Sequence, residues 1–248
     1  MIPTLSPLQW ALGLCGALCI GLSKSGFGGF GLLIVSLMAM VLPARESTGA
    51  VLPLLIAADL MAVRGFRRHA DRREIRALLP ATIPGLLAGW WLLDVIPGRV
   101  FGRILGGLIL AMTALVVWQR LDRRVLAAVR NHPSLAAFSG FLAGLSTMMA
   151  NAGGPAMTFH LMARRFDKMA FAGTCAWFFF ITNLIKVPFS LSLGLITPPS
   201  LLLDMLLLPA VAAGFLTGKA LLGRIPQGHF DLMLLAMSLA AALKLALG

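Results

Sequence analysis

Long apolar segments separated by short arginine clusters constrain this chain more than any other feature. The 248 residues are 59% hydrophobic and only 12% charged, whereas soluble domains are about 45–50% apolar and about 25% charged. A soluble domain of this size could not bury so much apolar surface, so a bilayer must cover it. We therefore expect an all-α polytopic membrane protein with a single transmembrane domain.

The apolar segments differ in length. Several are shorter than the roughly 20 residues that a helix needs to cross a bilayer. Since the short ones lie beside glycines, we expect eight to ten helical segments, some of them broken or re-entrant. The segments lie at roughly 8–23, 30–43, 48–63, 77–94, 103–118, 134–150, 154–163, 170–187, 200–223 and 230–247.

The loops between these segments carry most of the net charge of +12. Residues 64–76 alone hold six arginines, and residues 119–133 and 164–168 are also basic. Basic loops mark the cytoplasmic side of a membrane protein, so we expect a multi-pass inner-membrane protein and no nucleic-acid partner. If every segment crosses, both termini lie outside. Lys24 and Arg224 then join the cytoplasmic side, and the other side keeps Arg45, Arg99 and Arg103.

The chain also repeats itself. GLS at 21–23 recurs at 144–146, and LLPATIPGLLAG at 78–89 aligns with LLPAVAAGFLTG at 207–218. Two halves of about 120 residues are typical of a duplicated transporter core.

The loops indicate how the two halves are oriented. The arginine-rich loop 64–76 corresponds to residues 190–200 in the second half, which carry no charge. Equivalent loops on opposite sides predict inverted-topology repeats. We place the first repeat at about 8–118, a cytoplasmic linker at 119–133 and the second repeat at about 134–247.

The first candidate site is GLSKSGFGGFG, residues 21–31. Glycines allow tight turns that bring backbone N–H groups together around an anion, and Lys24 adds a full positive charge. Alternatively, Lys24 anchors the chain at the interface and the glycines only permit close helix packing. The candidate anion ligands are Ser23, Lys24, Ser25, Gly26, Gly28 and Gly29.

Two segments of the second half add candidates. In GLSTMMANAGGP, residues 144–155, Asn151, Gly153 and Gly154 fit a helix break with exposed backbone donors, or a plain packing loop. In GTCAWFFFITNLIKVPF, residues 173–189, Asn183 and Lys186 lie in an apolar helix. An intramembrane lysine is expensive, so Lys186 contacts the anion or extends to a boundary. The aromatic residues beside it, Trp177 and Phe178 to Phe180, are expected to pack or to contact lipid rather than to form a ligand cage.

Two residues could carry a proton. Asp59 is the counterpart of Asn183, and an ionised carboxylate in an apolar helix needs a cationic partner, for which Lys24 is the candidate. Its role is proton coupling or a structural ion pair. His160 could also carry a proton, or could be hydrogen-bonded near the cytoplasmic interface. Asp204 is expected at an interface.

Catalytic and metal-binding patterns are missing from the sequence. It contains neither H-E-x-x-H nor G-x-S-x-G, so we expect no enzyme activity, no cofactor and no metal site. Cys15, Cys19 and Cys175 are interpreted as small buried hydrophobic residues.

The motifs GLSKSGFGGFGLLIVSLMAMVLP, STMMANAGGPAMTFHLMARR and GTCAWFFFITNLIKVPF resemble those of the sulfite exporter TauE/SafE family. The resemblance runs from about residue 10 to the C-terminus. It implies transport of small sulfur-oxygen and organosulfur anions, including sulfite, sulfoacetate and aryl sulfonates. Phe27 and Phe30 interrupt the glycines of the first motif, which favours an organic sulfonate over sulfite.

Together these features predict a secondary active transporter of such anions, coupled to protons and working by alternating access. An anion channel and a non-transporting membrane subunit are the alternatives. Its partners would be the anion, protons and the lipid bilayer, with a homodimer left open. The residues do not distinguish import from export.

Overall fold

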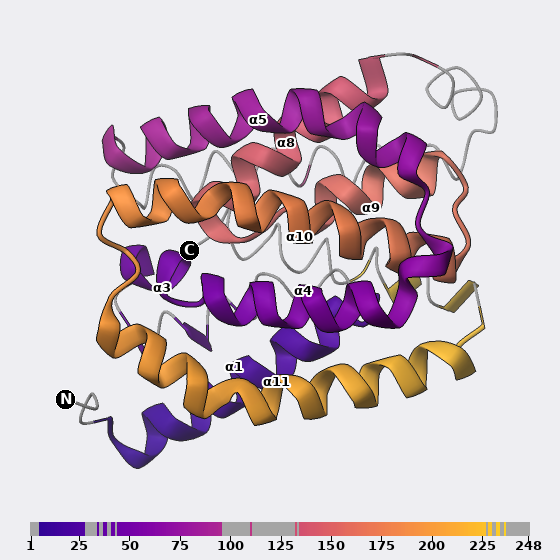
Figure 1. Cartoon of the computed structure of the whole chain (residues 1–248). Coiled ribbons are helices and arrows are strands. Elements are labelled where there is room, and N and C mark those ends of the chain that lie inside the picture. Colours follow the sequence, from indigo (N-terminus) through magenta and orange to yellow (C-terminus); the bar gives the residue numbers. More distant parts are fainter. Residues whose placement is uncertain are drawn as a thin grey trace.

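The computed structural model describes residues 5–27, 44–95 and 134–226, with scattered positions at 34, 37–38, 41–42, 110, 132, 228–229, 232–233 and 236. Every regular element in these ranges is a helix, which confirms the all-α prediction (Figure 1). Most of the predicted segments 30–43, 103–118 and 230–247, and of the predicted linker, lies outside the described residues.

The described helices follow the predicted apolar segments closely. Local sequence explains several helix starts: Ser6 forms a capping box with Gln9, Asp167 accepts hydrogen bonds from two backbone amides, and Thr197 precedes two prolines. The first half contains α1 (Pro7–Lys24), α3 (Ala44–Ala50), α4 (Leu52–Phe66), the 3₁₀ turn η2 (Arg67–His69) and α5 (Arg72–Val95). The second half contains α8 (Ser134–Ala150), α9 (Gly154–Ala163), α10 (Lys168–Ser192) and α11 (Pro198–Arg224).

Helix length separates spanning from partial segments. Within the described residues, four helical stretches are long and apolar enough to cross a membrane, namely 46–69, 72–95, 168–192 and 198–224. In contrast, the 10 residues of α9 extend only about 15 Å, half of the roughly 30 Å hydrocarbon core. The short segment predicted at 154–163 is therefore too short to cross the bilayer by itself, while the four longer stretches make this a multi-pass membrane protein.

Corresponding helices of the two halves exchange partners. The first helix of each half packs along the last described spanning helix of the other, α1 against α11 and α8 against α5 (Figure 1). The central helices α4 and α10 pack side by side and run in opposite directions. Gly49 before α4 meets Leu195 beyond the end of α10, while Gly173 near the start of α10 meets the end of α4 at Phe66.

Glycines at matched positions allow the closest approaches. Gly144 of α8 lies directly against the backbone of α5 at Thr82 and Leu86. Gly21 of α1 makes the corresponding contact with the backbone of α11 at Val211 and Phe215. In both places a Cβ atom would overlap a backbone carbonyl oxygen, so only glycine fits without moving a helix.

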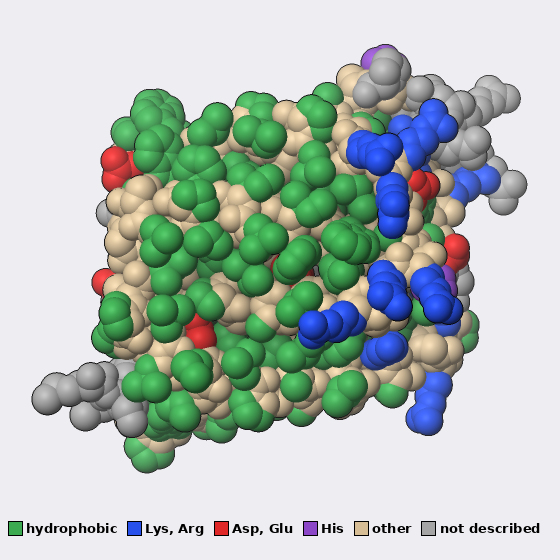
Figure 2. Space-filling view, in the orientation of Figure 1, with side chains coloured by type: hydrophobic (Ala, Val, Ile, Leu, Met, Phe, Trp, Pro, Cys, Tyr) green, Lys and Arg blue, Asp and Glu red, His purple; other side chains and the backbone are tan. Residues whose placement is uncertain are grey.

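Basic side chains gather at one end of the molecule (Figure 2). This end holds the α4–α5 turn and the start of α10, as Figure 1 shows. The α10–α11 turn at the opposite end carries no charged residue. Lys24 is not part of the exposed basic surface, because it forms a buried ion pair with Asp59 and its side chain is 11% exposed. The condition that every segment crosses does not hold for α9, whose 10 residues are too few for a complete span, so this short helix agrees with the expectation of partial segments.

The Gly144 contact gives a stability prediction. Gly144→Ala should destabilise the folded protein by about 1–3 kcal/mol, because the added methyl overlaps the Thr82 carbonyl and separates α5 from α8. Thermal unfolding of the detergent-solubilised protein measures the effect. Gly223→Ala is the matched control, since a Cβ there meets no atom within 4 Å. Equal melting temperatures for the two variants would contradict this packing.

Candidate functional site

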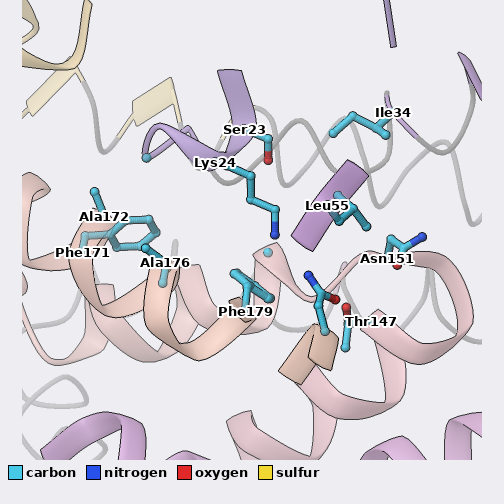
Figure 3. Close-up of a pocket in the computed structure, with 14 residues that line it drawn as sticks. Ser23, Lys24, Ile34, Leu55, Thr147, Asn151, Phe171, Ala172, Ala176 and Phe179 are labelled. Atoms are coloured by element: carbon cyan, nitrogen blue, oxygen red, sulfur yellow. The ribbon is translucent and has the colours of Figure 1, made fainter. Parts of the chain in front are cut away.

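A small cavity of about 40 Å³ lies where the two halves meet (Figure 3). It is formed by the end of α1, by α4, by the break between α8 and α9, and by α10. Its walls are mostly apolar, and a few polar groups converge on the space. The lining residues are Ser23, Lys24, Gly26, Ile34, Leu55, Thr147, Asn151, Gly154, Phe171, Ala172, Cys175, Ala176, Phe179 and Asn183.

Lys24 provides the positive charge of this cavity. It is the last residue of α1, and Gly26 beyond it adopts φ +116°, a conformation that favours glycine and turns the chain away. The Lys24 side chain points into the cavity (Figure 3). Its Nζ atom lies 2.7 Å from Asp59 Oδ1 and 4.6 Å from the centre of the Phe179 ring. The partner suggested by the sequence for Asp59 is therefore the partner in the structure.

Asp59 joins the two halves. It is fully buried in α4, and its second oxygen, Oδ2, accepts a 2.6 Å hydrogen bond from Asn183 Nδ2 of α10. Asp59 and Asn183 are matched positions in the sequence repeat, so the hydrogen bond connects equivalent points of the two halves. Asn183 Oδ1 is buried and has no hydrogen-bond partner among the described residues. One amide thus has an unused acceptor beside the cavity.

Asn151 holds the break between α8 and α9. Its φ of 50° is left-handed, which asparagine tolerates better than most residues. Its Nδ2 donates to the Thr48 carbonyl at 2.9 Å, and its Oδ1 accepts from Lys186 Nζ at 2.5 Å. Lys186 also donates to the Thr147 carbonyl at 2.7 Å. Lys186 therefore neither extends to a boundary nor lines the cavity; it fixes the broken helix from behind.

The described charged side chains around the cavity include two lysines but one carboxylate. Lys24 and Lys186 are buried within one polar cluster whose carboxylate is Asp59. With all three groups ionised, this described cluster carries one net positive charge. A buried excess charge is unfavourable in an apolar environment unless a counter-ion approaches it. The arrangement is thus suited to an anion.

His160 lies outside this cluster. It is fully buried in α9, and its Nε2 lies 2.8 Å from Glu74 Oε2 near the start of α5. Arg164 approaches the other Glu74 oxygen at 3.6 Å. His160 does not line the cavity, so the geometry agrees with the alternative of a hydrogen-bonded histidine near the basic end. A direct contact between His160 and an anion in the cavity is not available in this structure.

The residues predicted to bind the anion differ in whether they line the cavity. Ser25 points away: its hydroxyl donates to the Leu22 carbonyl and lies beside Gly218 of α11. Gly153 and Lys186 are not among the residues that line the cavity. Gly28 and Gly29 lie outside the described residues. Those that line the cavity are Ser23, Lys24, Gly26, Asn151, Gly154 and Asn183.

Several cavity residues were not anticipated. Phe179 contacts Lys24, although the aromatic run of α10 was expected to pack or to contact lipid. Of the aromatic residues in the glycine motif, Phe27 lies in the hydrophobic core, and Phe30 is outside the described residues. The helical position of Phe179, four residues before Asn183, was the available signal, because both then share one face of α10.

Some residues expected elsewhere also differ. Cys175 lines the cavity, and Cys15 is exposed on the outer surface instead of buried. Asp204 is 6% exposed within α11, and its Oδ2 has no hydrogen-bond partner in the described chain, whereas nothing in the sequence indicated that it would be buried against protein. Exposure depends on which face of a helix meets its neighbours, and local composition does not determine that face.

Comparison with known proteins agrees with the sequence motifs. The family model described as "Sulfite exporter TauE/SafE" matches residues 13–245, nearly the whole chain. No curated protein matches, and no solved structure matches. The match includes every residue that lines the cavity. Because it covers nearly the whole chain, the chain belongs to the sulfite exporter TauE/SafE family.

Proposed function

We propose that the protein is a proton-coupled secondary transporter of small sulfur-oxygen or organosulfur anions. The observation that carries this proposal is the Lys24 ammonium, which faces a small buried cavity while paired with a single carboxylate. The family description supplies the sulfite class. Sulfonates carry the same SO₃ group, which requires positive charge and hydrogen-bond donors.

The cavity offers these groups at one place. Lys24 Nζ would contact one oxygen of the anion, and the Ser23 and Thr147 side chains also line the cavity. The backbone at the start of α9 adds free N–H donors, because the first turn of a helix leaves them unpaired. Phe179 and Leu55 would exclude water from the bound group. A sulfonate would then exchange its hydration shell for protein donors.

Asp59 provides a route to proton coupling. In this structure the Asp59 carboxylate is paired with the Lys24 ammonium, so it competes with an anion for the same positive charge. A proton on Asp59 would remove this competing charge and raise the net charge of the cluster to that required by a doubly charged anion. Asn183 suits both states, because its amide donates to the carboxylate and, after rotation, could accept from the carboxylic acid. Binding of the proton and of the anion would therefore favour each other.

Alternating access would follow from inverted repeats. The exchanged partners α1–α11 and α8–α5, the matched glycine contacts and the opposite directions of α4 and α10 support that relationship. In such folds the halves rock around a fixed site near the midplane. The Asp59–Asn183 hydrogen bond joins the halves at equivalent points, as expected beside the axis that relates them.

A channel would share the same charged cavity but would need a continuous pore. Saturable flux into liposomes that depends on a pH gradient would support the carrier. Large single-channel currents would support the channel instead, and absence of any flux from correctly folded protein would support a non-transporting subunit.

The substrate class can be tested by ligand-dependent thermal stability. Sulfite, thiosulfate, alkyl sulfonates and aryl sulfonates are added separately to the purified protein, since a bound ligand raises the melting temperature by mass action. Sulfate, phosphate and chloride serve as comparison anions. A sulfur-anion carrier should respond to at least one of the first group and less to the comparison anions. Equal responses to all of them would contradict the proposal.

Removing the lysine should abolish binding. Lys24→Ala alone would leave Asp59 buried without its partner, which destabilises proteins by about 3–5 kcal/mol. The informative variant is therefore Lys24→Ala combined with Asp59→Ala, which removes the whole pair. We expect it to fold and to bind the identified anion at least about 30-fold more weakly, as measured by calorimetry.

Lys219→Gln is the matched control for that experiment, because Lys219 lies on α11 near the Phe66 ring and does not line the cavity. It should bind the anion as the unmodified protein does. Unchanged affinity in the double variant would show that the anion binds elsewhere.

Asp59→Asn should separate transport from the proton gradient. The amide keeps the size of the carboxylate but cannot carry the coupling proton. We expect exchange of anion for anion across liposomes to continue, while pH-driven accumulation falls to the level seen without a gradient. If accumulation stays pH-dependent, the proton travels by another group, and His160→Gln identifies whether His160 carries it.

A further inference from the structure

A second cavity lies on the outer surface between α5 and α10, close to the basic end. Its volume is about 250 Å³, and it is separate from the anion cavity, with which it shares no lining residue. Four apolar side chains and two arginines form its walls. They are Arg72, Ile75, Arg76, Leu79, Trp177 and Ile181.

The groove is polar at one end and apolar along its length. On α5, its residues recur at helical spacing, so Arg76 and Arg72 lie on the face of Leu79, about one and about two turns nearer the start of the helix. Both helices begin at the basic end, as Figure 1 shows, so Trp177 and Ile181 continue the apolar wall into the hydrocarbon region. The distance along α5 from Arg72 to Leu79 is about 10 Å at 1.5 Å per residue. This matches the step from a headgroup to the upper part of an acyl chain.

The two arginines are available to a ligand. Both are exposed, and neither forms an ion pair within the described part of the chain. Of the neighbouring carboxylates, Glu74 is directed inward to His160 and Arg164. Asp71 accepts hydrogen bonds from the backbone N–H groups of Arg73 and Glu74. Guanidinium groups bind phosphate oxygens in pairs of hydrogen bonds, and a basic pocket between membrane helices is typical of anionic lipid sites.

We propose that this groove binds an anionic phospholipid of the leaflet at the basic end. The phosphate would contact Arg72 and Arg76, and an acyl chain would lie along Ile75, Leu79 and Ile181. Trp177 closes the groove beside it, and an edge contact with Phe180, with ring centres 6.3 Å apart, holds the indole in place. A free phosphate or sulfate ion fits less well, because most of the groove wall is apolar and would remain uncovered.

This lipid would connect the halves of the protein. The groove lies between α5 of the first half and α10 of the second. A lipid bound there contacts both halves at the basic end, so its occupancy would depend on their relative position. The site is independent of which anion the protein carries.

Quenching of Trp177 fluorescence tests the proposal. The protein is placed in phosphatidylcholine vesicles that contain equal fractions of either brominated phosphatidylglycerol or brominated phosphatidylcholine. We expect stronger quenching by the anionic lipid, and we expect Trp177→Phe to remove the difference between the two lipids. The other tryptophans, among the five in the chain, provide the background that remains.

Charge variants then separate a specific site from general attraction. Arg72→Gln with Arg76→Gln should lower the preference for phosphatidylglycerol by about fivefold for each arginine. The matched control, Arg67→Gln with Arg73→Gln, removes the same charge from the same end but leaves the groove lining intact. Equal losses in the two double variants would overturn the proposal, since they would indicate only a basic surface.

Competition by soluble phosphate tests whether the groove binds a free oxyanion instead of a lipid. At millimolar concentration, phosphate should leave the lipid preference unchanged apart from the effect of ionic strength, which an equal ionic strength of sodium chloride reproduces. Stronger competition by phosphate than by chloride would overturn the assignment to a lipid and indicate a site for free oxyanions. These measurements do not use transport, so a negative result would contradict the lipid site without contradicting the proposed function.

Discussion

The buried ion pair between Lys24 and Asp59 sets conditions that the rest of the structure must meet. Removing two charges from water costs several kcal/mol for each ion, and good geometry with further hydrogen bonds is needed to offset it. The pair is 2.7 Å apart, and Asn183 provides the additional donor. This requires the end of α1 to lie beside both α4 and α10. The glycine contacts of α1 with α11 allow that approach.

Two packing contacts recur at matched positions of the sequence repeat, whereas the polar residues at matched positions differ. Gly21 and Gly144 make matching contacts, but the repeat position of Lys24 is occupied by Thr147 in the second half, and that of Asp59 by Asn183. Neutral residues in one half avoid a second buried ion pair and leave one cation facing the cavity. In a transporter with inverted halves, the scaffold can adopt two related states while a single charged centre serves both.

Sequence patterns predicted the membrane class, most helix positions and the Lys24–Asp59 partnership, because hydropathy and buried charge act locally or in pairs. They did not distinguish Ser23 from Ser25, which differ by two positions and face different neighbours. They predicted that Lys186 contacts the anion or extends to a boundary, whereas in the structure it turns inward to Asn151. Such choices depend on helix rotation, which is set by contacts with distant segments, here α11 and the α8–α9 break.

The arginines at the basic end show how one composition signal can serve several physical roles. All of them contribute to the charge asymmetry that orients a membrane protein. Arg164 points inward and approaches Glu74, thereby helping to tie the partial helix α9 to α5. Arg72 and Arg76 instead border an apolar groove on the outer surface. Orientation requires only the number of charges, whereas a lipid site requires their placement on one helix face, so substitutions that preserve the count can separate the two roles.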